Sequence, residues 1–260
     1  MTDQHRVSKN TFESLIANFP GTPGIVVKTL GQEQCFRFNA ELLFPAASLI
    51  KLPILWEFFY QCATGRIDPT EEIELRDEDI AIGFGVLRQL KPGLKLRLHD
   101  LAVLMTVISD NTAANLLIDR LGMENINTSI QNLGLMHTKL QHKLHDSSDL
   151  NQDNFTTPTD MARMLESFVQ QQSLLGEYKH EPLKLLEGQH CKNKLHLGVP
   201  KGTRLANKTG EALWLEHDVG VLFGQREAAV IVVMTTGLVE NYQGIELCRE
   251  VARLVYQELL

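Results

Sequence analysis

Strand-like segments lie near both ends of this chain and helix-like segments fill its middle, and this arrangement restricts the folds available to it. Short β-branched or alternating segments bounded by turn residues are typical of strands. Five such segments are present: Gly24–Leu30, Gln34–Phe38, Arg204–Lys208, Asp218–Phe223 and Ala228–Thr235. Because the strands fall into two blocks instead of alternating regularly with helices, we expect an α/β (α+β) protein with one antiparallel sheet.

Apolar residues recur at helical spacing in the terminal and central segments. The expected helices are Thr11–Asn18, Ser48–Cys62, Leu98–Leu117, Thr157–Gln170 and Tyr242–Leu259. We therefore expect terminal helices to flank the sheet, and a division into an α/β domain (residues 1–61 and 196–260) and an all-helical insertion (residues 62–195). The active site is expected between these two parts.

Composition excludes several classes of protein. With 260 residues and 43% hydrophobic content, the chain can bury a core and is not disordered. A net charge of −7 argues against nucleic acid or an anionic membrane as the main partner. The longest apolar runs, such as Leu101–Met105, fall far short of the roughly 20 residues that span a bilayer. The N-terminus has no apolar signal region, so we expect a cytoplasmic protein, or a periplasmic or secreted one if this is a mature form.

Cysteine and histidine give no strong sign of a metal or other cofactor. Four cysteines are too few for a disulfide scaffold, and we expect buried free thiols at Cys35, Cys62, Cys191 and Cys248. Three histidines, at 137, 142 and 145, offer one metal-site hypothesis, but neither an H-E-x-x-H pattern nor a cysteine pair accompanies them. Solvated loop histidines and no cofactor are the expectation.

A serine and a lysine three residues apart open one of the predicted helices. At this spacing Ser48 and Lys51 share one helix face, close enough to hydrogen-bond. Serine is a poor nucleophile without a neighbouring base, and a lysine of depressed pKa can be that base. Taken alone, the pair is better explained as a helix start with a solvated lysine.

Two further polar triplets stand at the ends of apolar segments. Ser109-Asp110-Asn111 follows an apolar run, where it could cap or kink a helix, or supply a hydroxyl that passes a proton and an amide that binds substrate. Lys208-Thr209-Gly210 closes a strand, where it could guard a sheet edge or present an ammonium, a hydroxyl and an open backbone edge to an anion.

The three segments together form a known set. Ser-x-x-Lys, Ser-Asp-Asn and Lys-Thr-Gly, in this order, are the signature of serine β-lactamases and penicillin-recognising enzymes. The chain resembles the class A β-lactamase superfamily from about Phe12 to Leu254. Further segments similar to the family pattern are 83–87, 92–93, 98–101, 154–162 and 217–220. The resemblance implies a β-lactamase/DD-peptidase-like fold.

The resemblance also implies a role for each matched residue. Ser48 would be the acylated nucleophile and Lys51 its base or proton relay. Ser109 would pass a proton to the leaving nitrogen, and Asn111 would hydrogen-bond the substrate amide. These roles describe one connected serine hydrolase site.

On the predicted strand, Lys208 and Thr209 would hold the carboxylate of the substrate beside Gly210. The backbone N–H groups of Ser48 and Glu211 would form the oxyanion hole, which stabilises charge that develops in the transition state.

Two positions depart from the family pattern. Leu144 stands where class A enzymes carry the glutamate that activates the deacylating water, and leucine cannot act as a base. Asp146 and Asp149 lie nearby and are candidates for a replacement base, although their spacing differs from the family pattern. His217 is the nearest match to an arginine that binds the substrate carboxylate, and would be a weaker, pH-dependent anion anchor.

These departures leave the activity open between several functions. The expected function is a β-lactamase-like hydrolase that acylates Ser48 with a β-lactam or a related amide or ester and releases it slowly. Alternatives are a penicillin-binding D-Ala-D-Ala-type peptidase, an esterase, or a non-hydrolytic binding module that uses the same pocket.

Overall fold

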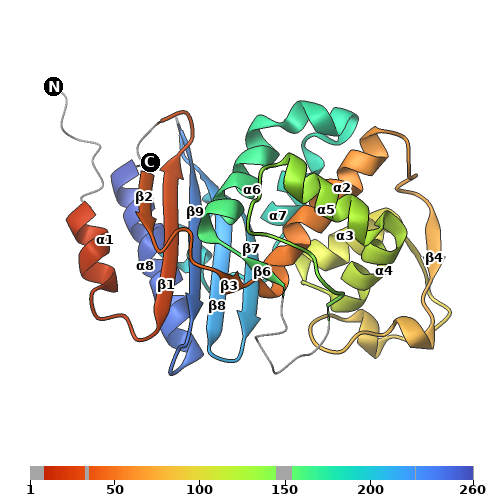
Figure 1. The fold of residues 1–260 in the computed structure, drawn as a ribbon, viewed down its shortest axis with the longest axis horizontal. Coiled ribbons are helices and arrows are strands. Elements are labelled where there is room, and N and C mark those ends of the chain that lie inside the picture. Colours follow the sequence, from red (N-terminus) through yellow and green to blue (C-terminus); the bar gives the residue numbers. More distant parts are fainter. Residues whose placement is uncertain (1–8, 33–34, 145–153, 226, 260) are drawn as a thin grey trace.

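One five-stranded antiparallel sheet forms the centre of the molecule (Figure 1). The computed structural model describes residues 9–32, 35–144, 154–225 and 227–259. The strands run in the order β2-β1-β9-β8-β7. Their bounds are Thr22–Thr29 (β1), Cys35–Phe38 (β2), Arg204–Ala212 (β7), Leu215–Phe223 (β8) and Ala228–Thr236 (β9). The predicted pairing of the N-terminal and C-terminal strands in one sheet is confirmed, because β1 pairs with β9 along its whole length.

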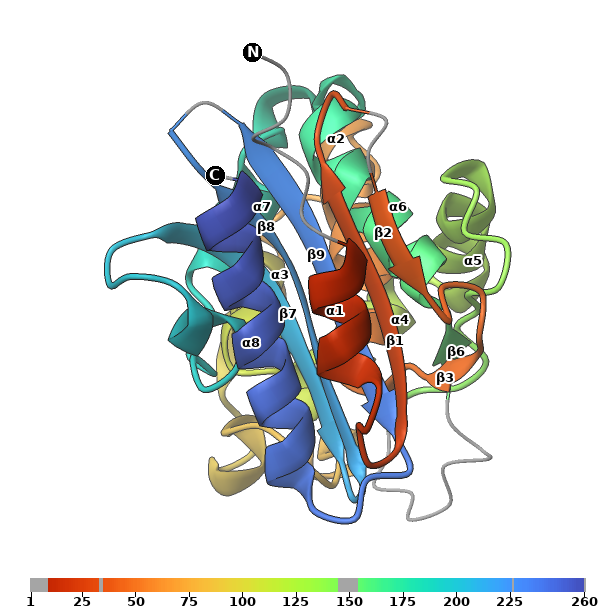
Figure 2. The ribbon, with the colours of Figure 1, turned by 90° about the vertical axis from the view of Figure 1, so that its left-hand side faces the viewer.

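Both faces of the sheet are buried, since alternate residues of each strand enter different cores. On β9, Ile231 and Val233 pack toward α1 (Lys9–Ile16) and α8 (Asn241–Leu259), which lie side by side on one face (Figure 2). Val230 and Val232 pack toward the larger core on the other face. The sheet is therefore a middle layer.

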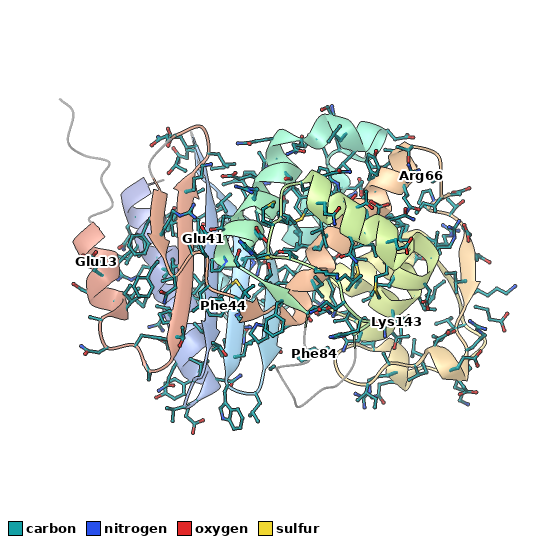
Figure 3. All side chains as sticks on the ribbon, in the orientation of Figure 1. Glu13, Glu41, Phe44, Arg66, Phe84 and Lys143 are labelled. Atoms are coloured by element: carbon teal, nitrogen blue, oxygen red, sulfur yellow. The ribbon has the colours of Figure 1, made fainter. Side chains whose placement is uncertain are left out.

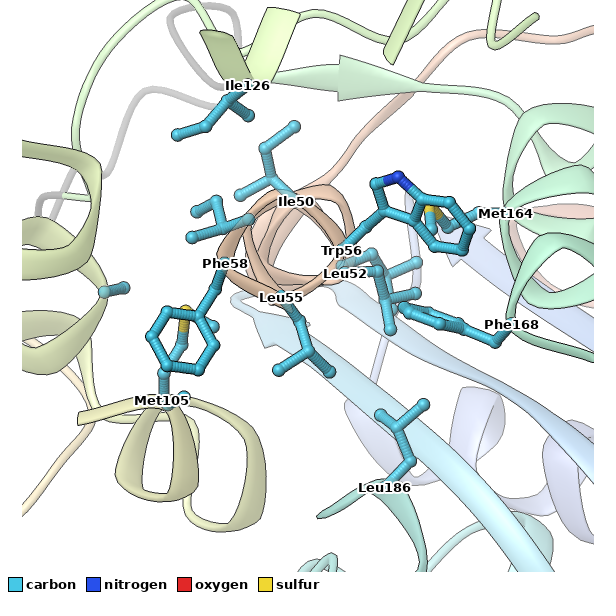
Figure 4. Close-up of a cluster of buried hydrophobic side chains, with 14 of the residues drawn as sticks. Ile50, Leu52, Leu55, Trp56, Phe58, Met105, Ile126, Met164, Phe168 and Leu186 are labelled. Carbon is cyan, nitrogen blue, oxygen red and sulfur yellow. The ribbon is translucent and has the colours of Figure 1, made fainter. Parts of the chain in front are cut away.

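A buried helix organises the second part of the molecule. All but two of the 13 residues of α2 (Lys51–Ala63) are buried. Figure 4 shows α2 end-on, with Trp56 directed toward Phe168 and Phe58 toward Met105. The surrounding helices are α3 (Leu98–Val107), α4 (Asn111–Leu121), α5 (Met123–Asn132), α6 (Pro158–Gln170) and α7 (Glu181–Glu187). Burial on every side fixes the position of α2, and with it the residues at its start.

Short elements connect these parts. The 3₁₀ turns are η1 (Ala47–Ile50), η2 (Asp77–Asp79), η3 (Leu87–Gln89), η5 (Gln172–Tyr178) and η6 (Leu195–Gly198). The short strands β3 (Phe44–Pro45) and β6 (Phe155–Thr156) pair, as do β4 (Glu72–Glu74) and β5 (Lys95–Arg97). None of the helices within the described ranges is long and apolar enough to cross a bilayer.

Several sequence expectations need correction. The predicted helix Leu98–Leu117 is two helices, α3 and α4, separated at Ile108–Asp110. Residues 62–195 are not wholly helical, because β4, β5 and β6 lie among them. Cys62 and Cys248 are buried thiols, but Cys191 is only half-buried. The side chain of Cys35 lies outside the described residues, and the division into domains stays a prediction.

Candidate active site

The candidate nucleophile stands on a tight turn between β3 and α2. Ala47 adopts a left-handed backbone conformation (φ 44°), which an alanine adopts only when its surroundings hold it there. The preceding residue, Ala46, donates its N–H to the carbonyl of Asn154 at 2.5 Å. After the turn, Ser48 is half-exposed while Leu49 is fully buried. The turn thus leaves the serine hydroxyl accessible at the start of a buried helix.

The side chain of Lys51 connects the serine to a second hydroxyl. Its Nζ lies 3.1 Å from Oγ of Ser48 and 3.0 Å from Oγ of Ser109. It also donates to the carbonyl of Ser109 at 2.6 Å and to Oδ1 of Asn111 at 2.7 Å. Burial, and then the positive charge of Lys208, hold the pKa of Lys51 well below its ordinary value. A neutral amine in this position has a lone pair for the serine proton.

Ser109 occupies the break between α3 and α4, in a left-handed conformation (φ 58°). The next residue, Asp110, caps α4 by accepting the N–H of Ala113 at 3.0 Å. Its other carboxylate oxygen accepts the N–H groups of Val86 and Leu87 at 2.7 and 2.9 Å. The capping interpretation of this triplet is confirmed, because its aspartate caps α4, and the same turn places Ser109 against Lys51.

The third triplet reaches the same place from β7. Nζ of Lys208 donates to Oγ of Ser109 at 3.0 Å and to the carbonyl of Thr209 at 2.9 Å. Burial lowers the pKa of Lys208 to about 8. A Cβ on Gly210 would lie 3.3–3.4 Å from His217, Ala47 and Leu49, so the glycine permits β7 to approach the turn before Ser48.

One hydrogen-bonded chain therefore connects Ser48, Lys51, Ser109 and Lys208 across three elements. The sequence predicted that these groups converge, and the contacts are all 3.1 Å or shorter. Asn111 touches Lys51 and donates its Nδ2 to the carbonyl of Ile82 at 3.0 Å. Such a chain can move a proton between two hydroxyls through an amine.

His217 is placed differently from the expectation. Its side chain is fully buried, and Phe44, labelled in Figure 3 where the sheet meets the helices, contacts the ring edge-on. Nδ1 accepts the N–H of Thr235 at 3.2 Å, so Nε2 carries the proton and donates to the carbonyl of Pro45 at 2.9 Å. Burial lowers the pKa of His217 to about 4. A buried neutral ring does not fit the predicted anion anchor, and instead it connects β8 to the segment before Ser48.

Leu144 is the last residue of the described segment 35–144. Its N–H donates to Oδ1 of Asn115 and its carbonyl accepts from Nδ2 of Asn115, both at 2.8 Å. The leucine side chain belongs to the larger core. Asp146 and Asp149, the two candidate replacement bases, lie outside the described residues.

The metal hypothesis involves His145, which also lies outside the described residues. Within the segments that the structure describes, no three His, Cys, Asp or Glu side chains are grouped so as to hold a metal ion.

Sequence reasoning missed two buried charged residues next to the site. Lys194 is fully buried and contacts Glu211 and Glu216. Asp218, also fully buried, accepts hydrogen bonds from Nδ2 of Asn207 at 2.8 Å and from the N–H of Leu195 at 3.0 Å. Burial raises the pKa of Asp218 to about 7. Asp218 could have been singled out as a charged residue at an inward position of a predicted strand. No sequence pattern distinguishes Lys194.

Comparison with known proteins decides the family. A family model described as "Beta-lactamase enzyme family" matches residues 8–259. The chain belongs to this family. Curated relatives include β-lactamase PSE-4 from Pseudomonas aeruginosa, 23% identical over 80% of this chain and 74% of the relative. The predicted serine hydrolase of the β-lactamase family is confirmed at this level.

Solved structures confirm the fold. A β-lactamase from Sphaerobacter thermophilus superposes with a TM-score of 0.91 at 30% identity, covering 98% of each chain. The structure of PBP-A superposes with a TM-score of 0.88 at 31% identity, covering 96% of this chain and 94% of that one. A leucine-to-glutamate variant of PBP-A, described as an acyl-enzyme complex with penicillin G, has a TM-score of 0.87 at 30% identity, with the same coverage.

Proposed function

We propose that this protein is acylated by β-lactams on Ser48 and releases the acyl group slowly. The observation that carries the proposal is the chain of contacts from Ser48 through Lys51 to Ser109 and Lys208. It supplies a nucleophile, a base of lowered pKa and a second hydroxyl in one hydrogen-bonded network.

Acylation follows from this arrangement. The neutral amine of Lys51 takes the proton of Ser48 as its Oγ bonds to the lactam carbonyl carbon. The carbonyl oxygen becomes negative and accepts the N–H groups of Ser48 and Glu211. As the carbon–nitrogen bond breaks, the proton passes from Lys51 through Ser109 to the leaving nitrogen. The single product is an acyl ester of Ser48 that still carries the leaving amine, because the broken bond was part of the lactam ring.

Substrate binding is assigned to the groups that surround this path. At a pKa of about 8, Lys208 is mostly protonated at neutral pH and attracts a carboxylate, with the hydroxyl of Thr209 beside it. The carboxamide of Asn111, which accepts from Lys51 and donates to the carbonyl of Ile82, is proposed to bind the substrate amide.

Deacylation is proposed to be the slow step, because the matched position for a water-activating carboxylate holds Leu144. A positioned base contributes typically ~10²–10⁴-fold to such a step. Without one at this place, water attacking the ester depends on Lys51 or on solvent. The similarity to PBP-A supports acylation by penicillins, because a variant of PBP-A forms an acyl-enzyme with penicillin G.

A penicillin-binding D-Ala-D-Ala-type peptidase is the second candidate. Leu144 favours it, because slow release of β-lactams is compatible with turnover of a different ester or amide. A non-hydrolytic binding module has less support, since the contact of 3.1 Å between Ser48 and Lys51 is suited to catalysis.

Rapid mixing with a chromogenic cephalosporin tests the proposal. We expect a burst of one ring-opening per enzyme molecule, followed by a slow steady rate. A fast steady rate of ring-opening without an initial burst would reject slow deacylation. No ring-opening and no bound product would reject β-lactam acylation altogether.

A further inference from the structure

A lysine that the proposed reaction does not use lies against the β7–β8 hairpin. The side chain of Lys194 is fully buried, one residue before η6. Its Nζ lies 2.5 Å from Oε2 of Glu216 and 3.3 Å from Oε2 of Glu211. It also donates to the main-chain carbonyl oxygens of Gly210 and His217, each at 3.3 Å. The ammonium thus contacts both strands of the hairpin through their backbones.

Lys194 keeps its charge in this position. Burial acts to lower its pKa, but the carboxylates of Glu216 and Glu211 more than compensate, so the pKa is raised above the ordinary value. Glu216 is held in turn by Nδ2 of Asn241 at 2.8 Å. A positive charge is therefore fixed beside the carbonyl of Gly210.

The carbonyl of Gly210 and the N–H of Glu211 belong to the same peptide group. No described peptide bond is cis, and in a trans peptide the C=O and the N–H point in opposite directions. Since the carbonyl is directed at Lys194, the N–H of Glu211 points away from it. Lys194 also contacts the carbonyl of His217 on β8, so a group that points away from Lys194 points away from β8. Because β7 is the last strand of the sheet, such a group faces its open edge, where substrate is proposed to bind.

A cation at the carbonyl end of a peptide also changes the charge at its other end. Hydrogen bonds in series polarise one another, strengthening each by roughly 10–30% in condensed-phase estimates. An ammonium is a stronger donor than a neutral amide. It therefore makes the N–H at the opposite end of the same peptide a better donor to an oxyanion.

We propose that Lys194 is a positioning residue that orients and polarises the Gly210–Glu211 peptide, strengthening the Glu211 half of the oxyanion hole. This inference rests on the proposed function, because it assigns that hole to an acylation reaction. A purely structural ion pair with Glu216 would stabilise the hairpin without altering the bond between Glu211 and the bound acyl carbonyl. The two roles therefore differ in an observable property of the acyl-enzyme.

The test is the infrared stretching band of the ester carbonyl after acylation with benzylpenicillin, together with the acylation rate constant. The double variant Lys194→Met/Glu216→Gln removes the charge without leaving Glu216 ionised and unpaired. We expect its carbonyl band at higher wavenumber than that of the unmodified protein, since a weaker hydrogen bond polarises the ester less. Acylation should slow about ten-fold, less than the ~10²–10³ that follows loss of a whole oxyanion donor.

Three companion variants separate positioning from stability. Lys194→Gln, which keeps an amide donor for Glu216, should shift the band in the same direction and serves if the double variant does not fold. Glu216→Gln retains the ammonium with Glu211 as its counter-charge, and should not raise the band. Glu57→Gln disturbs a different buried carboxylate, bonded to Gln61 at 2.7 Å, and should cost stability without moving the band.

Each outcome has a definite meaning. An unmoved band in both charge-removing variants, with normal labelling, overturns the role of Lys194 and leaves the proposed function standing. An equal upward shift in Glu57→Gln or Glu216→Gln overturns it too, because general loosening then explains the band. Failure of benzylpenicillin to label the unmodified protein rejects the proposed function, and the inference falls with it.

Discussion

Replacing Leu144 with glutamate tests the assignment of slow deacylation. Leu144 is 9% exposed and its backbone is held at both polar groups by Asn115. Burying a leucine side chain contributes about 1.5–3 kcal/mol, so Leu144→Glu should lower the free energy of unfolding by roughly 2–3 kcal/mol. The same burial disfavours the charged form of the new carboxyl group.

The kinetic gain should be partial for the same reason. A well-placed base contributes ~10²–10⁴-fold, but the fixed backbone directs this side chain into the core, so we expect deacylation to rise only about ten-fold. Acylation should be nearly unchanged, because the contacts of Lys51 with Ser48 and Ser109 are untouched. Leu144→Gln is the matched control, because glutamine has the shape of glutamate but cannot act as a base. It should lose similar stability with no gain in the deacylation rate.

Single-turnover kinetics with a chromogenic cephalosporin, followed by intact-mass decay of the adduct, measures both steps. An equal gain in Leu144→Gln would refute the argument, since loosening of the loop would then explain it. Fast hydrolysis by the unmodified protein without an adduct would show that another residue, Asp146 or Asp149 first, already acts as the base.

Two further predictions concern charge. Lys208→Met removes the neighbouring charge that helps to lower the pKa of Lys51, so the acidic limb of the pH profile for acylation should move to higher pH; an unmoved limb would contradict this coupling. His217, with a pKa of about 4 against 6.5, binds its proton more weakly in the folded than in the unfolded chain, so its contribution to stability is present above pH 6.5 and is lost as the pH falls toward 4. Between pH 7.5 and 5 the unmodified protein should lose about 2 kcal/mol more than His217→Gln in urea unfolding; equal losses would contradict neutral burial.

The sequence was informative where a pattern is local. Ser48 and Lys51 stand one helical turn apart, and the strands carry β-branched alternation, so both the nucleophile pair and the sheet could be predicted. The triplet at Ser109 was a candidate helix cap or kink, but the segment Leu98–Leu117 was still expected as one helix, because α3 and α4 bury apolar residues in the same core and the helical periodicity continues across the break.

Tertiary contacts determined the rest. In the sequence, His217 stands at the position expected for an anion anchor. In the folded chain its ring is buried and donates to the carbonyl of Pro45, 172 residues away. Lys194 lies in a loop segment without periodicity, and its partners Glu211 and Glu216 arrive from a hairpin later in the chain. A charge whose partners come from another element carries no signal in the sequence around it.

Mapping the covalent adduct tests the central claim most directly. After exposure to benzylpenicillin, the intact protein should gain the mass of one whole penicillin, and peptide analysis should place it on Ser48. The Ser48→Ala variant, folded to the same extent by circular dichroism, should gain nothing. An unmodified mass after prolonged exposure, or an adduct that persists in Ser48→Ala, would contradict the account.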